Sequence, residues 1–240
     1  EPFTAVLQEV VEPPLVDYAA LQERREGLDA YLASLARVSP STLEAASREE
    51  RLAFWINAYN ACMLRLVVDH YPIRRRGGLL DRLKNVVAGR PANSVWQIED
   101  VFTREHCRVA GEERSQDQIE HEIIRPMGEP RIHFAVNCAA RSCPPIWPEA
   151  YRAETLDRQL DAAVEAFVAS PRHFRAVREN GAAVRLNKVL DWYGEDFGGV
   201  DGLRDFFRPY VDDDVAALLR DRETDIEFLD YDWTLNDTSP

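Results

Sequence analysis

A thiol, an imidazole and a carboxamide lie close together in this chain, as Cys138, His133 and Asn137. A cysteine attacks carbon as its thiolate, which forms near neutral pH only beside a cation, an imidazole or hydrogen-bond donors. A carboxamide can orient the imidazole or bind an oxyanion. These residue types favour a thiol-dependent hydrolase or transferase that acts on amide, thioester or peptide-like substrates, with Cys138 as the nucleophile.

Two histidines are candidates for the catalytic base. His133 precedes Cys138 by five residues, and an extended chain would separate their backbones by roughly 16 Å. His121 follows Glu120 and lies four residues after Asp117, which could orient the imidazole on a helix. We therefore expect His121 to be the better base. The expected catalytic set is Cys138, His133, His121, Glu120 and Asn137. A surface ion pair is the simpler explanation of the Asp117–His121 spacing, and His133, between two apolar neighbours, also fits a hydrogen-bonded core histidine.

The four cysteines also allow interpretations without catalysis. Cys138 and Cys143 lie in a turn-rich segment and could form a disulfide in a non-enzymatic binding or scaffold module. Redox or metal handling is a third option, although the spacings match no standard zinc site. Cys62 lies in a helix pattern and Cys107 in a strand pattern, so we expect both to be packed thiols. No metal and no cofactor is assigned.

Substrate contacts are expected from two other regions. Asn57 and Asn60 are three residues apart on a helix, beside Tyr59, and either line a pocket or bind loop backbone. Tyr193 and Asp196 lie in a segment bounded by glycines, where an acid could face the site. The expected substrate-binding set is Asn57, Asn60, Tyr59, Cys143, Tyr193 and Asp196.

Composition limits the partners of the protein. The 240 residues are 45% hydrophobic and 10% aromatic, which is typical of a globular chain with a full core. A net charge of −13 disfavours nucleic acid and anionic lipid. No apolar run approaches the about 20 residues that span a bilayer. Phosphate-loop, dinucleotide, HExxH and GxSxG motifs are absent from the sequence, which leaves a small or peptide-like ligand.

Apolar periodicity predicts a long central helix from Ser47 to His70, which ends before Pro72. Ser115 and Gln118 fit a capping box that begins another helix. The expected class is α+β, one domain over 1–240 with helices on a small, mostly antiparallel sheet, an extended arm at 1–14, and a strand and tail at 225–240. Further helices are expected at 16–38, 155–168, 203–210 and 213–220, and strands at 94–102, 106–109, 131–137, 183–186 and 226–229.

Five segments resemble the family known as domain of unknown function 547, in family order and over nearly the whole chain. They are Phe54-Trp55-Ile56-Asn57-Ala58-Tyr59-Asn60, Ile119-Glu120-His121, His133-Phe134-Ala135-Val136-Asn137-Cys138 with Ser142-Cys143-Pro144, Trp192-Tyr193-Gly194-Glu195-Asp196-Phe197, and Tyr231-Asp232-Trp233-Thr234-Leu235-Asn236.

The resemblance implies a periplasmic or extracellular mature protein, because bacterial members of the family usually carry an export signal or a lipid anchor. A start at Glu1-Pro2, without an initiator Met or an apolar export segment, fits a mature secreted form or a shortened chain. A central helix followed by a sheet is also similar to papain-like and transglutaminase-like folds. In those enzymes the helix carries the nucleophilic cysteine, whereas here it offers Asn57 and Asn60. The thiol would therefore come from Cys138 or Cys143.

Overall fold

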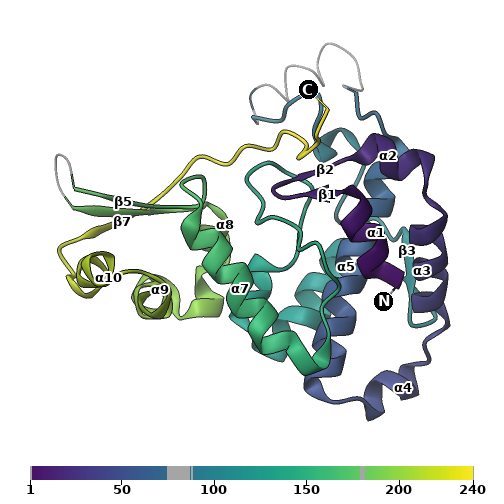
Figure 1. Cartoon of the computed structure of the whole chain (residues 1–240), viewed down its shortest axis with the longest axis horizontal. Helices are drawn as coiled ribbons and strands as arrows, with labels where there is room; N and C mark the ends of the chain where they lie inside the picture. Colours follow the sequence, from purple (N-terminus) through teal and green to yellow (C-terminus); the bar gives the residue numbers. More distant parts are fainter. Residues whose placement is uncertain (1, 75–86, 88, 179–181, 240) are drawn as a thin grey trace.

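The structure is a computed structural model that describes residues 2–74, 87, 89–178 and 182–239. It belongs to the α+β class, as expected, with its strands in small sheets (Figure 1). In the described part of the chain, no helix combines the length and the apolar character needed to cross a membrane.

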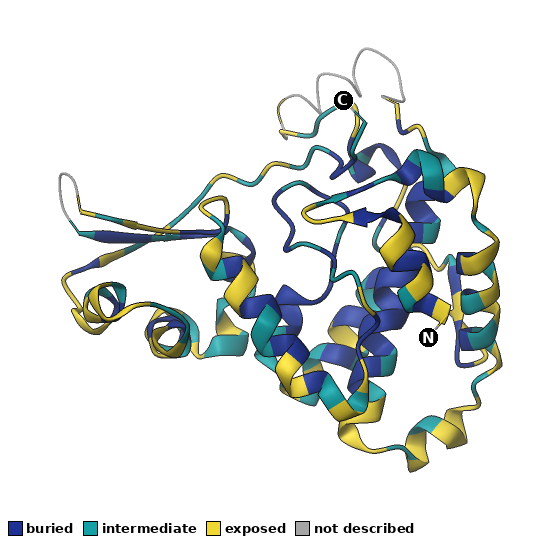
Figure 2. Ribbon diagram, in the orientation of Figure 1, coloured by how far each residue is buried: buried dark blue, intermediate teal, exposed yellow. Residues whose placement is uncertain are grey.

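The long helix α5, Arg48–His70, is the centre of the larger core, which confirms the predicted element. It begins with a capping box, in which the Ser47 hydroxyl accepts from the Glu50 N–H and the Glu50 carboxylate accepts from the Ser47 N–H. Fifteen of its 23 residues are buried, so it is covered on nearly every side (Figure 2). The rest of the fold therefore packs around α5 and fixes the side chains on most of its faces.

The N-terminal region packs against α5 and differs from the expectation in two respects. Residues 2–10 form the helix α1, Pro2–Val10, where an extended arm was predicted. The helix expected at 16–38 is divided into α2, Tyr18–Glu23, and α3, Glu26–Arg37. The α1 helix is amphipathic, and its Phe3 ring stacks on the Tyr31 ring of α3 at 4.5 Å. The remaining elements here are β1, Val11–Glu12, β2, Leu15–Val16, and α4, Pro40–Ala45.

Two predicted strands are absent. Residues 131–134 belong to the 3-10 helix η4, Pro130–Phe134, and residues 135–137 form no strand. The helix forms because Pro130 favours the first helical turn and Glu129 accepts a hydrogen bond from the Arg131 N–H. Residues 94–102 hold only the short 3-10 helix η1, Val95–Gln97. The strand expected at 106–109 is confirmed as β3, Cys107–Val109, which pairs with β4, Glu112–Arg114. Because η4 is coiled, the argument that separated His133 from Cys138 by an extended backbone was wrong.

The Ser115–Gln118 capping box is confirmed, with hydrogen bonds of 2.8 and 3.1 Å. It leads into η2, Gln118–Ile124, which has π-helical geometry, and then into η3, Arg125–Met127. Downstream, η5 covers Ala153–Thr155, and the predicted helix follows as α7, Leu156–Ala169.

The C-terminal third forms a second core, which contains Phe167 and Phe207 and also buries Phe134 of η4. Its sheet has the order β5-β6-β7, with strands Phe174–Val177, Ala183–Leu186 and Asp225–Phe228. The β5–β6 pair is antiparallel and the β6–β7 pair is parallel. The helices and turns of this part are α8, Val189–Trp192, η6, Gly194–Phe197, α9, Gly199–Phe207, η7, Arg208–Tyr210, and α10, Asp213–Arg220.

The parallel pairing of β6 and β7 brings two distant segments together. The carboxyl ends of parallel strands lie at the same edge, so the chain leaving β6 into α8 emerges beside the chain leaving β7 into the tail. The tail then crosses to the N-terminal region, where the Val16 N–H donates to the Asn236 carbonyl (Figure 1). This crossing places the tail over the loop that contains Cys138, since the Asn236 N–H donates to the Ala139 carbonyl.

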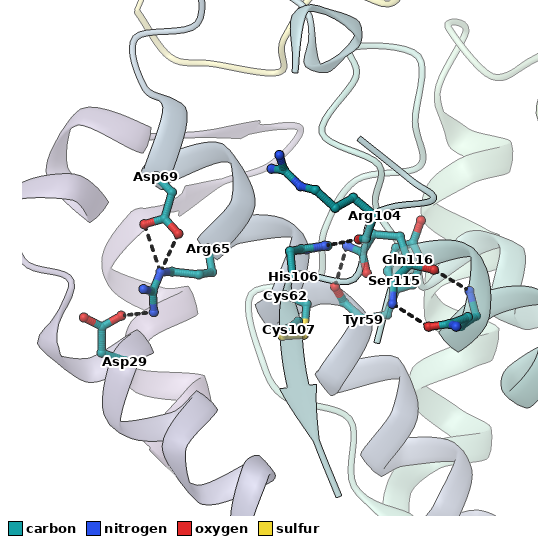
Figure 3. The surroundings of a disulfide bond; sticks show 11 residues. Asp29, Tyr59, Cys62, Arg65, Asp69, Arg104, His106, Cys107, Ser115 and Gln116 are labelled. Carbon is teal, nitrogen blue, oxygen red and sulfur yellow. Dashed lines mark hydrogen bonds and ion pairs between the residues drawn. A yellow bond between two sulfur atoms is a disulfide. The ribbon is translucent and has the colours of Figure 1, made fainter. Parts of the chain in front are cut away.

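The disulfide bond joins Cys62 of α5 to Cys107 of β3 (Figure 3). The expectation that both are packed thiols was therefore wrong. Each pattern was assigned to the correct element, but only the fold brings the two Cα atoms to 5.7 Å, within the range that a disulfide spans. Cys138 and Cys143 are both free thiols. The structure therefore does not contain the disulfide between them that was considered as an alternative.

Candidate active site

A pocket of about 320 Å³ lies where the central helix, the Cys138 loop, α8 and the tail meet. Its lining comes from segments far apart in the sequence, which the β6–β7 pairing and the tail bring together. The lining residues are Tyr59, Trp96, Phe102, Asp117, Glu120, His133, Val136, Cys138, Cys143, Pro144, Val189, Trp192, Tyr193, Tyr231 and Trp233.

The Cys138 thiol is surrounded by hydrogen-bond donors. The Cys143 thiol, the Tyr231 hydroxyl and the Ala140 N–H all interact with its sulfur, and the Tyr231 oxygen lies 3.1 Å from it. These donors stabilise the negative charge of the thiolate more than burial destabilises it. The hydrogen bond from Cys143 is the largest effect, and the pKa of Cys138 is therefore held below that of an ordinary cysteine.

The neighbouring Cys143 has the opposite character. Its side chain is buried, and burial raises the pKa of the Cys143 thiol well above its usual value. Its sulfur accepts the Cys138 N–H at 2.9 Å, which fixes the two residues relative to each other. The pKa values of the two thiols are therefore shifted in opposite directions, and the negative charge is favoured on the partly exposed Cys138.

His133 is held as a neutral imidazole with one free nitrogen. Its Nε2 lies 2.7 Å from Oδ2 of Asp196, and its ring stacks on Tyr193 at 4.2 Å. Burial lowers the pKa of His133, and Asp196 offsets only part of this effect. In the neutral ring Nε2 donates to Asp196, so Nδ1 keeps its lone pair. Nδ1 is buried without a hydrogen-bond partner among the described residues.

Asp196 is itself fixed by Arg125. The guanidinium donates from Nε and Nη2 to the two carboxylate oxygens, at 2.7 and 2.8 Å. This hydrogen bonding, with His133 as the second partner, lowers the pKa of Asp196 to about 2. Asp196 therefore stays ionised and keeps the His133 ring in one orientation, while it does not line the pocket itself.

Glu120 is a buried acid that faces the pocket from η2. The Tyr193 hydroxyl interacts with its carboxylate. Burial, together with the negative charge of Glu120, raises the pKa of Tyr193, so this hydroxyl remains a donor. The same carboxylate acts electrostatically on His133, Tyr59 and Cys138.

The fold brings six of the predicted site residues to the pocket wall and places Asp196 behind His133. The six are Tyr59, Glu120, His133, Cys138, Cys143 and Tyr193. His121 is not among them. Its Nδ1 lies 2.9 Å from Arg125, and its Nε2 lies 4.0 Å from Asp117, with both side chains of that pair partly exposed. The pocket wall therefore contains His133 and not His121, although His121 was expected to be the better base.

The three predicted asparagines bind loop backbone and lie outside the pocket lining. The Asn57 side chain accepts from the Tyr151 N–H at 2.9 Å and donates to the Tyr151 carbonyl at 2.8 Å. Asn60 makes a similar pair, donating to the Ala135 carbonyl and accepting from the Asn137 N–H. These amides connect α5 to the segments around the pocket, which is the second of the two roles considered for them.

Asn137 shapes the turn that carries Cys138. Its side chain donates to the Pro144 carbonyl at 2.7 Å and accepts from the Ala139 N–H at 2.8 Å. Ala139 has a φ of 61°, a left-handed conformation that an L-residue with a side chain adopts at a cost of roughly 1–2 kcal/mol. Strain of this kind persists where surrounding contacts hold it, and it is common at functional sites. Asn137 thus positions Cys138.

An aromatic wall completes the pocket and was not predicted. We use this name for Trp96, Phe102, Trp192, Tyr231 and Trp233. Trp233 contacts all four of the others, with ring centroids at 5.1 Å from Trp96, 6.4 Å from Phe102, 5.7 Å from Trp192 and 4.5 Å from Tyr231. The aromatic content of the tail was visible in the sequence, but the parallel pairing that brings the tail to α8 was not.

Metal ligation receives no support from the described residues, because none of their His, Cys, Asp and Glu side chains form a group of three or more that could hold an ion. A family model described as "Protein of unknown function, DUF547" matches residues 43–168. This match covers more than half of the chain, which therefore belongs to that family. The matched region contains Glu120, His133 and both free cysteines, and ends before Asp196. No curated protein and no solved structure gives a match.

Proposed function

We propose that this member of the DUF547 family is a thiol-dependent hydrolase or acyltransferase that acts on thioester, amide or peptide-like substrates. One observation carries the proposal: a thiol whose thiolate is stabilised by donors shares a pocket with a neutral imidazole that a carboxylate orients. Nucleophile, base and orienting acid are the three parts that such catalysis requires. Cys138 is the nucleophile, His133 the base and Asp196 its positioning residue.

With a thioester, the Cys138 thiolate attacks the carbonyl carbon. The bond to the substrate's own sulfur breaks, that sulfur leaves as a thiolate, and the acyl group remains on Cys138 as a new thioester. The donors around the Cys138 sulfur suit this step, since they lower the pKa of the thiol and so increase the thiolate fraction without a permanent cation beside it.

In the second step, water or an amine attacks the acyl group on Cys138. Nδ1 of His133 accepts a proton from this nucleophile, the bond from carbon to the Cys138 sulfur breaks, and the thiolate is restored. The proton on His133 is then released to solvent, which balances the charge of the thiolate that left in the first step. An amide requires a different order, in which Nδ1 first takes the Cys138 thiol proton and then delivers it to the leaving nitrogen.

The test is turnover of an aryl thioester, followed through the absorbance of the released aryl thiolate. Cys138→Ser should abolish turnover, and His133→Gln should lower kcat by about 10²–10⁴-fold. His173→Gln is the matched control, because His173 is also buried and stacked on an aromatic ring but lies outside the pocket lining. Turnover that survives in Cys138→Ser, or equal losses in the two histidine variants, would overturn the proposal.

A thiol–disulfide oxidoreductase is the second candidate, favoured by the contact between Cys138 and Cys143. Cys138 would attack a substrate disulfide, and Cys143 would then displace the reduced substrate from the mixed disulfide. The raised pKa of Cys143 opposes its role as the second nucleophile, which places this candidate below the first. Dithiothreitol-driven reduction of a peptide disulfide that depends on both cysteines, without thioester turnover, would reverse the order.

The proposed location is periplasmic or extracellular. The Cys62–Cys107 disulfide supports this location, because such bonds persist in oxidising compartments and are rare in a reducing cytosol. Counting thiols in protein isolated from its native source, denatured in the presence of an alkylating reagent, tests it. Two protected and two free cysteines support the proposal, and four free cysteines contradict it.

A further inference from the structure

We propose that the pocket recognises an alkylammonium group, so that the substrate is a cationic amine derivative small enough for the hollow. This inference rests on the proposed function for the identity of the reaction, and it adds the class of substrate. It is carried by the charge of the pocket, by the aromatic wall and by the size of the cavity.

The charge of the lining is negative. Its acidic residues are Asp117 and Glu120, and among the described residues that line it none is a lysine or an arginine. His133 is buried and bonded to Asp196, and the thiolate form of Cys138 adds a further negative charge. The charged side chains of this lining would therefore repel an anionic substrate and attract a cation.

Glu120 is the acid that a cationic ligand in the pocket would stabilise most. It is only 6% exposed, and no ion pair between described residues involves it. The Tyr193 hydroxyl bonds to its carboxylate and the Arg125 guanidinium acts on it electrostatically, without forming an ion pair with it. A buried carboxylate that has no cation in direct contact gains stability when a cationic ligand provides one. Its neighbour Arg125 is already bound through two hydrogen bonds to Asp196 and packs on the Tyr193 ring at 5.1 Å. An ammonium group from a ligand would bring a positive charge into direct contact with Glu120.

The aromatic wall offers the complementary surface. Faces of tryptophan and tyrosine attract cations, and sets of such rings bind quaternary ammonium groups in water. The wall already attracts one cation of the chain itself, since the Arg90 guanidinium lies 4.0 Å from the centre of the Trp96 ring. Trp192 is 45% exposed, which is unusual for so large an apolar side chain and leaves part of the wall accessible to a ligand.

The size of the hollow suits a small ligand. A volume of about 320 Å³ lies at the lower end of ordinary ligand pockets, which favours a molecule or side chain of amino-acid size over a polymer segment. Because Glu120, the aromatic wall and Cys138 border the same cavity, one small molecule can place its ammonium against the acid and rings while its carbonyl reaches the thiol.

The experiment is a titration of intrinsic tryptophan fluorescence with choline and with 3,3-dimethylbutan-1-ol, which has the same shape and no charge. Cys138→Ser protein is used beside the wild type, because binding requires no thiol chemistry. Choline should bind about tenfold more tightly than the neutral compound. Glu120→Gln should remove most of this difference, and Trp192→Leu should weaken choline binding.

Glu122→Gln is the matched control, since it removes an exposed carboxylate two residues from Glu120. Circular dichroism of each variant checks the fold. Equal binding of the two compounds, no choline binding, or a preference that survives in Glu120→Gln would overturn the inference. Choline binding without thioester turnover would retain the cation site and remove the proposed enzyme, so the two failures are distinguishable.

Discussion

Removal of the Tyr231 hydroxyl tests how the Cys138 thiolate is stabilised. The Tyr231 oxygen lies 3.1 Å from the Cys138 sulfur, and its ring packs on Trp192 at 4.8 Å and on Trp233 at 4.5 Å. Tyr231→Phe keeps the ring and deletes only the donor. A hydrogen bond to a charged group contributes roughly 1.5–3 kcal/mol. Since one pKa unit corresponds to about 1.4 kcal/mol, the pKa of Cys138 should rise by about 1–2 units.

The assay is the rate of alkylation of Cys138 by iodoacetamide, resolved by peptide mass spectrometry and measured as a function of pH. The pH at half-maximal rate should move upward in Tyr231→Phe. At a pH below the wild-type midpoint the thiolate fraction should fall about tenfold or more. The rate should fall less, by about threefold or more, because a more basic thiolate is intrinsically more reactive.

Tyr210→Phe is the control, since its hydroxyl donates to Asp161 at 2.6 Å and does not contact either free cysteine. The reasoning would be refuted by an unchanged midpoint in Tyr231→Phe. An equal shift in both tyrosine variants would also refute it, because that result would trace the change to general packing.

Three further predictions concern stability. Replacing Cys62 and Cys107 together by alanine should lower the free energy of unfolding by about 4 kcal/mol, as measured by urea denaturation, because the bond closes a loop with a sequence separation of 45. Burial lowers the pKa of His173 to about 4, so protonation favours the unfolded chain. Stability should therefore be complete above about pH 6.5 and decline toward pH 4 by about 3 kcal/mol, and His173→Gln should lack this part of the slope. Asn57→Ala should cost roughly 2–4 kcal/mol in thermal or urea unfolding, because it leaves the Tyr151 N–H and carbonyl unpaired; a loss below half of this would show that water replaces the amide.

The elements predicted best are those whose signals are local and repeated. The α5 helix has a capping box at Ser47, and Pro72 follows soon after its end. Apolar residues recur along its whole length at helical spacing. Residues 131–137 were predicted wrongly because a few alternating residues are equally compatible with a 3-10 turn. Pro130 was the local signal for that turn.

The sequence predicted which residue types form the candidate site, but it did not predict which of these residues contact each other. Cys138, His133 and Glu120 were singled out, but pairing His133 with Asp196 requires contact across 63 residues. The disulfide likewise joins residues 45 apart, and no property of Cys62 or Cys107 alone distinguishes a bonded thiol from a packed one. Long-range pairings of this kind depend on tertiary packing, which a single sequence does not reveal.

The mass of the protein after brief exposure to an aryl thioester tests the central claim most directly. Acid quenching followed by peptide mapping should locate one acyl group on Cys138, in wild-type protein without reductant. The His133→Gln variant should retain this acyl group for longer, because the base acts on its removal. A protein that acquires no acyl group, or acquires it at Cys143 or at a lysine, would contradict the account.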